Sequence, residues 1–293
     1  MIYSCAVAAA GTLLMYHALR GDVAAEQRIY AAAKEDIPKV YAAGCHATFD
    51  AVDRPPCVFG QPDAPVTVVL FGDSHGAQWF PAFERLAIEH NWRLLSLTKS
   101  ACPSFDIAVF SEEKRRAYFE CETWRTRMME RIASAKPALV VLANSSRYDP
   151  ALGWEARVRR TVDRFATNGI PVAIVRDTPW PGVNGPICLA RMSWMNRDAE
   201  NECSFQRNQA MSWATPFWEA ESRAVSGYST SLLIDLTSEI CPDDRCGVSR
   251  SGKVLYMDSH HLTASYASSL APALAARLRE WAGRPDSPVR ALF

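Results

Sequence analysis

The sequence has no excess of charge of either sign, and this excludes one class of partner. Its 293 residues contain 32 Lys and Arg residues against 32 Asp and Glu residues. A protein that binds nucleic acid through a broad positive field needs a basic excess, so we expect no nucleic-acid partner. The chain also lacks internal repeats, low-complexity segments and a glycine-rich phosphate loop. Its length fits one large domain with appendages or two small domains.

The nine cysteines include no Cys-x-x-Cys pair, which argues against a structural zinc site. Cys5 lies in an apolar N-terminal segment, and the other eight cysteines fall into four successive close pairs. These pairs are 45/57, 102/121, 188/203 and 241/246. Structural disulfides are the better interpretation, and they indicate an oxidising compartment. The spacing alone leaves the connectivity open. We expect no metal site, because no metal-ligand cluster is evident in the sequence.

Residues 1–19 contain no formally charged side chain. The length of this run approaches the roughly 20 residues that a transmembrane helix needs. A cleaved signal peptide would have a basic region ahead of the apolar run, and none is present. A buried helix of a soluble domain is the other alternative. We predict a single transmembrane helix. Arg20 argues weakly against export of the following chain, but the cysteines favour export, and we follow the cysteines.

The rest of the chain alternates between apolar strand patterns and helical patterns. We predict a linker over 20–62, whose part 23–41 could form a surface helix, one domain over 63–284 and a tail over 285–293. The predicted strands are 66–71, 92–97, 138–143, 171–175 and 232–236. The predicted helices are 76–90, 112–135, 152–168, 205–225 and 263–281, with a long loop over 179–203. This order indicates a three-layer α/β/α sandwich around a five-stranded, mainly parallel, flavodoxin-like sheet.

The junction between the first strand and the first helix contains a candidate nucleophile. Six apolar or β-branched residues are followed by Gly72-Asp73-Ser74, and the helical pattern begins directly afterwards. Ligands in open α/β sheets bind at the carboxyl ends of strands, and a helix N-terminus offers N–H groups to an oxyanion. We predict that Ser74 is the nucleophile and that its N–H is an oxyanion donor. A helix N-cap is the alternative role.

A serine needs a base, and the segment 256–262 near the other end of the chain supplies one. Histidine titrates near neutral pH, so His261 can accept the serine proton and return it. Asp258 would hold the ring of His261 in the required tautomer. His260 is the competing base, although its spacing from Asp258 is shorter.

Several ordered motifs resemble the SGNH (GDSL-like) hydrolase superfamily. Its Gly-Asp-Ser block and Asp-x-x-His block match Gly72-Asp73-Ser74 and Asp258-x-x-His261. The sequence is most similar to the extracytoplasmic SGNH domain fused to, or partnered with, acyltransferase family 3 membrane proteins, which O-acylate cell-surface polysaccharides. The motifs that support this are Gly-Asp-Ser-His at 72–75, Gln-Trp-Phe-Pro at 78–81, Thr-Lys-Ser-Ala-Cys-Pro at 98–103, Cys-Glu-Thr-Trp-Arg at 121–125 and Asp-Ser-His-His-Leu-Thr at 258–263.

The resemblance, which covers about residues 45–284, implies how the protein would work. It implies O-acyl transfer through an acyl-serine, with a cell-surface glycan as acceptor and an acyltransferase 3 membrane module as partner. The transferred group would be acetyl. Its donor would derive from acetyl-CoA through that partner, so we expect no bound cofactor. The domain would lie in the periplasm, anchored in the inner membrane by residues 1–19. The resemblance also favours disulfides between successive cysteines: Cys45–Cys57, Cys102–Cys121, Cys188–Cys203 and Cys241–Cys246. A carbohydrate esterase and a non-catalytic glycan-binding module remain alternatives.

The remaining candidate residues follow strands on the same sheet edge. Asn144 could donate its amide to the oxyanion, or could simply be a turn residue at the strand end. The glycine and the Gly-x-Asn-Asp block of many superfamily members are missing at this edge. The residues expected near the substrate are Asp73, which would also orient the turn, His75, Lys99, Ser100 and His260. Trp79 and Trp180 are candidates for stacking on a sugar.

Overall fold

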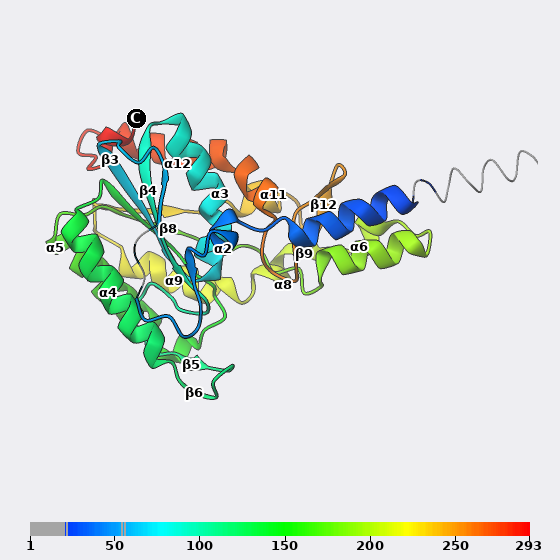
Figure 1. Ribbon diagram of the computed structural model, residues 1–293, viewed down its shortest axis with the longest axis horizontal. Coiled ribbons are helices and arrows are strands. Elements are labelled where there is room, and N and C mark those ends of the chain that lie inside the picture. The colour runs from blue at the N-terminus through cyan, green and yellow to red at the C-terminus, as the bar shows by residue number, and fades with distance from the viewer. Residues whose placement is uncertain (1–20, 22, 54, 56) are drawn as a thin grey trace, which may run out of the picture.

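A parallel sheet forms the centre of the molecule (Figure 1). The computed structural model describes residues 21, 23–53, 55 and 57–293. Five strands run parallel in the order β4, β3, β7, β8, β10. Their bounds are Trp92–Lys99 for β4, Val66–Gly72 for β3, Leu139–Ala143 for β7, Val172–Val175 for β8 and Ser231–Ile234 for β10. The predicted α/β fold with a mainly parallel sheet is confirmed.

The two faces of the sheet contribute to two separate hydrophobic clusters. Along β3, Val68 and Leu70 belong to one cluster, while Val69 and Phe71 belong to the other. This follows because successive side chains of a strand point to opposite faces. Helices α3 (Ser74–Glu89), α11 (Ala264–Ser269) and α12 (Ala271–Ala282) contribute to the first cluster. Helices α4 (Phe119–Ala135), α5 (Trp154–Thr167) and α9 (Ala214–Ala224) contribute to the second. The molecule therefore has three layers (Figure 1).

The sheet has seven strands, two more than predicted. The segment predicted as a linker adds β1 (His46–Ala47), parallel to β4, and β2 (Cys57–Gly60), antiparallel to β4. Strands of two and four residues are too short for hydrophobic periodicity to reveal them. The residues around the Cys45–Cys57 disulfide therefore form the edge of the sheet.

The N-terminal part of the described chain is helical over residues 23–35, ahead of α2 (Lys39–Ala42). It lies beside α6 (Gly185–Trp194), where Gln27 Nε2 donates to the Ala190 carbonyl at 2.8 Å (Figure 1). The transmembrane helix predicted for residues 1–19 lies outside the described residues. Among the helices of the described part, none combines the length and apolar character needed to cross a membrane.

Two predictions of local structure are wrong. The start of the predicted helix 112–135 is instead a hairpin of β5 (Phe110–Ser111) and β6 (Arg116–Ala117), and α4 begins only at Phe119. The predicted loop 179–203 contains α6 and α7 (Ala199–Glu202). The Asn184 side chain accepts a hydrogen bond from Ile187 N, and Pro186 lies in the first turn of α6. These residues start a helix, although Asn and Pro also occur in loops.

Two predicted helices are divided. The helix predicted over 205–225 consists of β9 (Ser204–Gln206), α8 (Arg207–Met211) and α9, while 263–281 divides into α11 and α12 at Leu270. Pro272 lacks the N–H that a continuous helix would use, which favours the division there. The remaining elements are α10 (Thr237–Ile240), β11 (Arg245–Gly247), β12 (Ser249–Arg250), β13 (Lys253–Val254) and the short 3₁₀ helices η1 (Pro150–Leu152) and η2 (Arg290–Leu292).

The disulfides have the sequential pairing that the family resemblance implied. They join Cys45 to Cys57, Cys102 to Cys121, Cys188 to Cys203 and Cys241 to Cys246. Each closes a short loop, with sequence separations between 5 and 19 residues. Each therefore restrains local structure and does not tie distant parts of the chain together.

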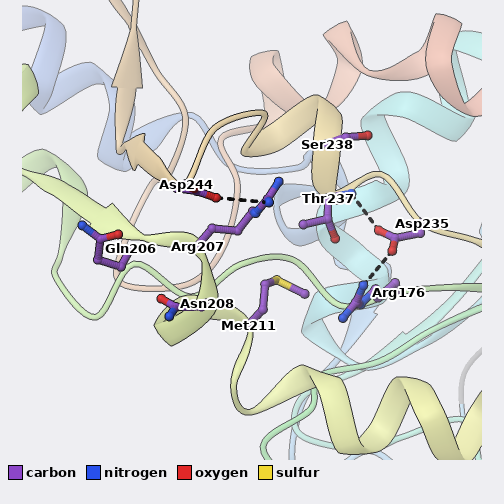
Figure 2. A pocket seen from close by; sticks show the side chains of 9 residues that line it. All are labelled: Arg176, Gln206, Arg207, Asn208, Met211, Asp235, Thr237, Ser238 and Asp244. Atoms are coloured by element: carbon purple, nitrogen blue, oxygen red, sulfur yellow. Dashed lines mark hydrogen bonds and ion pairs between the residues drawn. The ribbon is translucent and has the colours of Figure 1, made fainter.

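A polar cavity of about 630 Å³ lies at the carboxyl ends of β8 and β10. Arg176 follows β8, and its guanidinium pairs with Asp235, which follows β10, at 2.7 Å (Figure 2). Arg207 and Asp244 form a second ion pair in its wall, so the cavity has no excess charge. This cavity shares the sheet edge at which Ser74 lies.

Candidate active site

Ser74 is the first residue of α3, directly after the turn that leaves β3. Asp73 is the N-cap, because its Oδ1 accepts a hydrogen bond from His75 N at 2.8 Å. Ser74 therefore does not have the capping role that was the alternative for it. Asp73 Oδ2 also accepts hydrogen bonds from Ser145 N and from the Tyr148 hydroxyl, which ties the turn to the loop after β7. Through these contacts Asp73 orients the turn.

Gly72 and Gly76 let this turn approach β7 closely. A Cβ atom on Gly72 would lie 1.8 Å from the Ala143 carbonyl oxygen, and one on Gly76 would lie 2.9 Å from the same oxygen. Neither glycine is among the residues with positive φ. Their role is therefore steric: they allow close contact and do not supply a left-handed turn conformation.

Three side chains from the two ends of the sequence form a hydrogen-bonded chain. Ser74 Oγ lies 3.0 Å from His261 Nε2, and His261 Nδ1 lies 2.7 Å from Asp258 Oδ2. The other oxygen of Asp258 accepts hydrogen bonds from the backbone N–H groups of His260 and His261. Burial opposes the charged carboxylate, but these hydrogen bonds outweigh it and hold the pKa of Asp258 well below its usual range. This is the arrangement in which histidine can accept a proton from serine.

A second histidine–aspartate pair lies beside the hydrogen-bonded residues Ser74, His261 and Asp258. His75 Nδ1 lies 2.5 Å from Asp177 Oδ1, and both side chains are buried. Asp177 also accepts hydrogen bonds from Ser146 N at 2.7 Å and Thr178 N at 2.8 Å. Burial alone would lower the pKa of His75 and raise that of Asp177. Their mutual attraction outweighs burial, so the pKa of His75 is raised and that of Asp177 is lowered.

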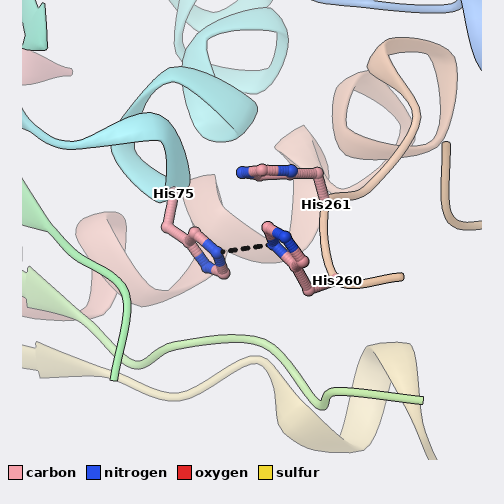
Figure 3. A group of neighbouring side chains, drawn as sticks. All are labelled: His75, His260 and His261. Carbon is pink, nitrogen blue, oxygen red and sulfur yellow. Dashed lines mark hydrogen bonds between the residues drawn. The ribbon is translucent and has the colours of Figure 1, made fainter. Parts of the chain in front are cut away.

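His260 connects the two histidine–aspartate pairs. Its Nδ1 lies 3.1 Å from His75 Nε2, and its ring centroid lies 4.0 Å from that of His261 (Figure 3). Burial, together with the charges that His261 and His75 can carry, lowers the pKa of His260 to about 3. His260 therefore stays neutral at physiological pH, and its Nδ1 is occupied by His75 and not by Asp258.

A profile of the SGNH domain (fused to AT3 domains) matches residues 44–276. The chain belongs to this family. No curated protein matches the sequence. The fold is similar to that of the periplasmic domain of a lipopolysaccharide acetyltransferase from Salmonella ser. Paratyphi A, with a TM-score of 0.60 and 12% identity over 75% of this chain and 85% of that one.

A weaker likeness is to a protein from Slackia heliotrinireducens assigned to the SGNH hydrolases. Its TM-score is 0.49 and its identity 11%, over 74% of this chain and all of that one. The resemblance to SGNH domains associated with acyltransferase 3 proteins, read from the motifs, is thus confirmed by the family match.

In this SGNH domain, the side chain of Asn144 is engaged by Ser104. Its Oδ1 accepts a hydrogen bond from Ser104 N at 2.8 Å, and its Nδ2 lies 2.9 Å from Ser104 Oγ. An oxyanion role for Asn144 stays a prediction, and it would use an amide hydrogen that Ser104 does not take. The two residues expected near the substrate at the end of β4 have other partners. Lys99 is buried and donates to the carbonyls of Thr48, Phe49 and Ala51, while Ser100 Oγ pairs with His46.

The two tryptophans considered for sugar stacking differ in their surroundings. Trp79 is buried in the core. Trp180 stacks on His260 with ring centroids 4.3 Å apart, and the guanidinium of Arg147 lies 4.6 Å from the Trp180 ring centroid. The same guanidinium lies 4.9 Å from Trp213, which is 57% exposed. The partly exposed Trp180 ring therefore already has two partners, and Trp213 is the more exposed of the two rings beside Arg147.

Sequence reasoning missed Asp177, which is the buried partner of His75. One available signal was its position. Asp177 stands two residues after β8, at the same sheet edge as Ser74, where polar residues of parallel strands collect. Arg147 follows β7 at that edge and was missed for the same reason.

Proposed function

We propose that this SGNH domain transfers an acyl group through a covalent acyl-serine on Ser74. The observation that supports it is the hydrogen-bonded chain from Ser74 Oγ through His261 to Asp258, with distances of 3.0 and 2.7 Å. Serine is unreactive without a base, and this arrangement provides one. Asp258 remains ionised because the pKa of its carboxyl group is depressed, so it can stabilise the imidazolium that forms on His261.

In the first half-reaction, Ser74 Oγ attacks the acyl carbonyl while His261 Nε2 takes the hydroxyl proton. The negative charge on the carbonyl oxygen would be met by the N–H of Ser74, since the first N–H groups of a helix have no intrahelical acceptor. Collapse of the tetrahedral intermediate breaks the bond to the leaving group, which receives the proton from His261. The acyl group then remains on Ser74.

In the second half-reaction, a hydroxyl group attacks the acyl-serine. His261 takes the proton of this hydroxyl and returns it to Ser74 Oγ as the ester bond to serine breaks. We propose a hydroxyl of a cell-envelope glycan as the acceptor and acetyl as the acyl group. The family description, an SGNH domain fused to AT3 domains, supports an acyltransferase 3 membrane module as the partner that supplies the acyl group.

Water as the acceptor would make the protein an esterase. The partial exposure of the site favours this second candidate, because 12% of the His261 side chain remains accessible to solvent. The same acyl-serine forms in both cases, and only the second half-reaction differs.

We also infer that the domain functions outside the cytoplasm. The four disulfides support this, because thiols stay reduced in the cytosol. Anchoring by a helix over residues 1–19 in the inner membrane remains part of the proposal.

The test follows turnover of p-nitrophenyl acetate by the full chain with its disulfides formed, with and without oligosaccharide acceptors. Ser74→Ala and His261→Ala should each lower turnover by at least about 1,000-fold. Asp258→Asn should lower it by about 10,000-fold, because it favours the wrong tautomer of His261. Ser134→Ala, at an exposed serine near the end of α4, should leave turnover unchanged.

The products distinguish the candidate functions. Acetylated sugar that appears only when Ser74 is present establishes the transferase, and acetate alone with every acceptor favours the esterase. If the folded protein shows no turnover that depends on Ser74, then the proposal is wrong, and a non-catalytic glycan-binding module becomes the better explanation.

A further inference from the structure

The fold brings three histidines together from two distant segments. His75 is the second residue of α3, while His260 and His261 precede α11, and 185 residues separate His75 from His260. Each offers one ring nitrogen to a common space, and these three nitrogens all lie within 4.8 Å of one another (Figure 3). No ligand-spacing motif in the sequence indicates this group, because His75 is far along the chain from His260 and His261.

One of the separations between these nitrogens is close to that of a first-row transition metal site. Zinc binds histidine nitrogen at about 2.0–2.1 Å in a tetrahedral arrangement, which places two ligand nitrogens about 3.4 Å apart. His75 Nε2 and His260 Nδ1 are already 3.1 Å apart. All three nitrogens lie within 4.8 Å of one another, so His261 Nε2 would have to leave Ser74 Oγ, which it meets at 3.0 Å, to bind the same ion.

The outer neighbours of these histidines are also those of a zinc site. His75 and His261 each use Nδ1 to donate to a carboxylate, Asp177 at 2.5 Å and Asp258 at 2.7 Å. Such carboxylate–histidine pairs fix the tautomer that leaves Nε2 free to bind a metal. Two carboxylates next to the site also balance the charge of a divalent cation.

We propose that His75, His260 and His261 form a zinc-binding site. The His261 nitrogen that binds the ion is the one that meets Ser74 Oγ at 3.0 Å, so the ion and the Ser74–His261 hydrogen bond exclude each other. The hydrogen bond between His75 and His260 holds one proton between their nitrogens, and metal binding releases this proton to solvent. Zinc is therefore a reversible inhibitor of any reaction in which His261 acts as the base.

The direct test uses Co²⁺ as a spectroscopic substitute for zinc. The full chain, without a histidine tag and with Cys5→Ser to remove the thiol outside the described residues, is titrated with Co²⁺. The visible absorption of tetrahedral Co²⁺ should appear and should be lost on addition of Zn²⁺. His75→Ala and His260→Ala should each weaken binding by at least about tenfold, and Asp177→Asn by about 10- to 100-fold.

Two controls make the assignment specific. His90→Ala removes a histidine at the end of α3 whose ring meets Arg279, and it should leave the titration unchanged. Ser74→Ala removes the hydrogen bond that competes with the metal, so this variant should bind Co²⁺ as tightly as the parent chain or more tightly. Circular dichroism checks the folding of each variant. If His75→Ala does not fold, then His260→Ala, at a partly exposed position, still tests the proposal. Absence of the band in the parent chain, or unchanged affinity in His260→Ala, overturns the proposal.

The inhibition arm rests on the proposed function, whereas the Co²⁺ titration does not. If Ser74-dependent turnover is found, then Zn²⁺ should suppress it, EDTA should restore it, and the ratio of rates with and without Zn²⁺ should approach one in His260→Ala. If no turnover is found, the acyl-transfer proposal fails while the titration still decides the zinc site. Turnover insensitive to Zn²⁺ at concentrations that saturate the Co²⁺ site would refute inhibition.

Discussion

His75 and Asp177 form a buried ion pair in which Nδ1 and Oδ1 are 2.5 Å apart and both side chains are only 2% exposed. This pair joins the start of α3 to the segment after β8. Asp177 also accepts a hydrogen bond from Ser146 N, so it holds the loop after β7 as well. One carboxylate therefore fixes three of the segments that surround Ser74.

We predict that Asp177→Asn destabilises the protein by about 3–5 kcal/mol, because it leaves His75 buried without its counter-charge. Asp258→Asn should cost less, since the Asp258 side chain is 35% exposed and water can replace part of the interaction. Denaturant unfolding of both variants provides the comparison. Equal losses of stability would contradict the greater structural importance of the buried pair.

The pH dependence of this pair has a definite sign. Folding raises the pKa of His75 above 6.5, so its contribution is full below that value and is lost as pH rises through the folded pKa. Folding lowers the pKa of Asp177 below 3.8, so its contribution is full above that value and is lost as pH falls through the folded pKa. The stability difference between parent and Asp177→Asn should therefore be largest between pH 3.8 and 6.5.

We predict that Gly72→Ala destabilises the protein by at least about 3 kcal/mol, because backbone would have to move to admit the methyl group. The added Cβ would lie 1.8 Å from the Ala143 carbonyl oxygen. Gly283→Ala is the control, since its nearest contact would be an ordinary 3.4 Å. Thermal unfolding compares the two. A small loss for Gly72→Ala would mean that β3 and β7 can separate at little cost.

The sequence was sufficient to predict the centre of the fold and the three hydrogen-bonded residues Ser74, His261 and Asp258. The five parallel strands are rich in apolar residues, although β4 also contains Arg93 and Ser96, and this pattern is determined by local sequence. Ser74 and His261 are 187 residues apart, yet the sheet topology brings strand ends to one edge, as expected. Each of the two residues belongs to a short motif, Gly72-Asp73-Ser74 or Asp258-x-x-His261, and these motifs led to the prediction.

The parts that sequence reasoning missed depend on long-range contacts. Asp177 and His75 are 102 residues apart, and neither belongs to a spacing motif that names the other. Lys99 was expected near the substrate, but three carbonyls of the loop 48–51 take its ammonium group, a contact that no local pattern encodes. Helix α6 was missed because Asn184 and Pro186 occur both in loops and at helix starts.

We predict that the disulfides contribute unequally to stability. The chain-entropy model gives about 3 kcal/mol for Cys102–Cys121 and about 2 kcal/mol for Cys241–Cys246, because the first closes the longer loop. Their sequence separations are 19 and 5 residues. The double alanine variants of each pair, unfolded in denaturant, test the order. A greater loss on removing Cys241–Cys246 would show that this bond acts through native contacts and not through loop closure.

The last prediction concerns Glu221, a buried residue of α9 whose Oε1 accepts a hydrogen bond from Trp154 Nε1 at 3.1 Å. Burial raises the pKa of Glu221 from 4.5 to about 8, although the Trp154 hydrogen bond opposes the rise. The native state therefore keeps this proton at neutral pH, while the unfolded chain releases it. The resulting stabilisation is full below pH 4.5 and is lost as pH rises through the folded pKa, by at most about 1.4 kcal/mol per pH unit.

Glu221→Gln keeps an oxygen acceptor for Trp154 but removes the titration, so its stability should fall less steeply than that of the parent as pH rises from 4.5 towards 8. Glu219→Gln, at an exposed position on the same helix α9, is the matched control and should retain the parent slope. Denaturant unfolding at several pH values measures all three slopes. Parallel pH profiles for Glu221→Gln and the parent would mean that Glu221 is already ionised in the folded protein, and that α9 tolerates a buried charge beside Trp154.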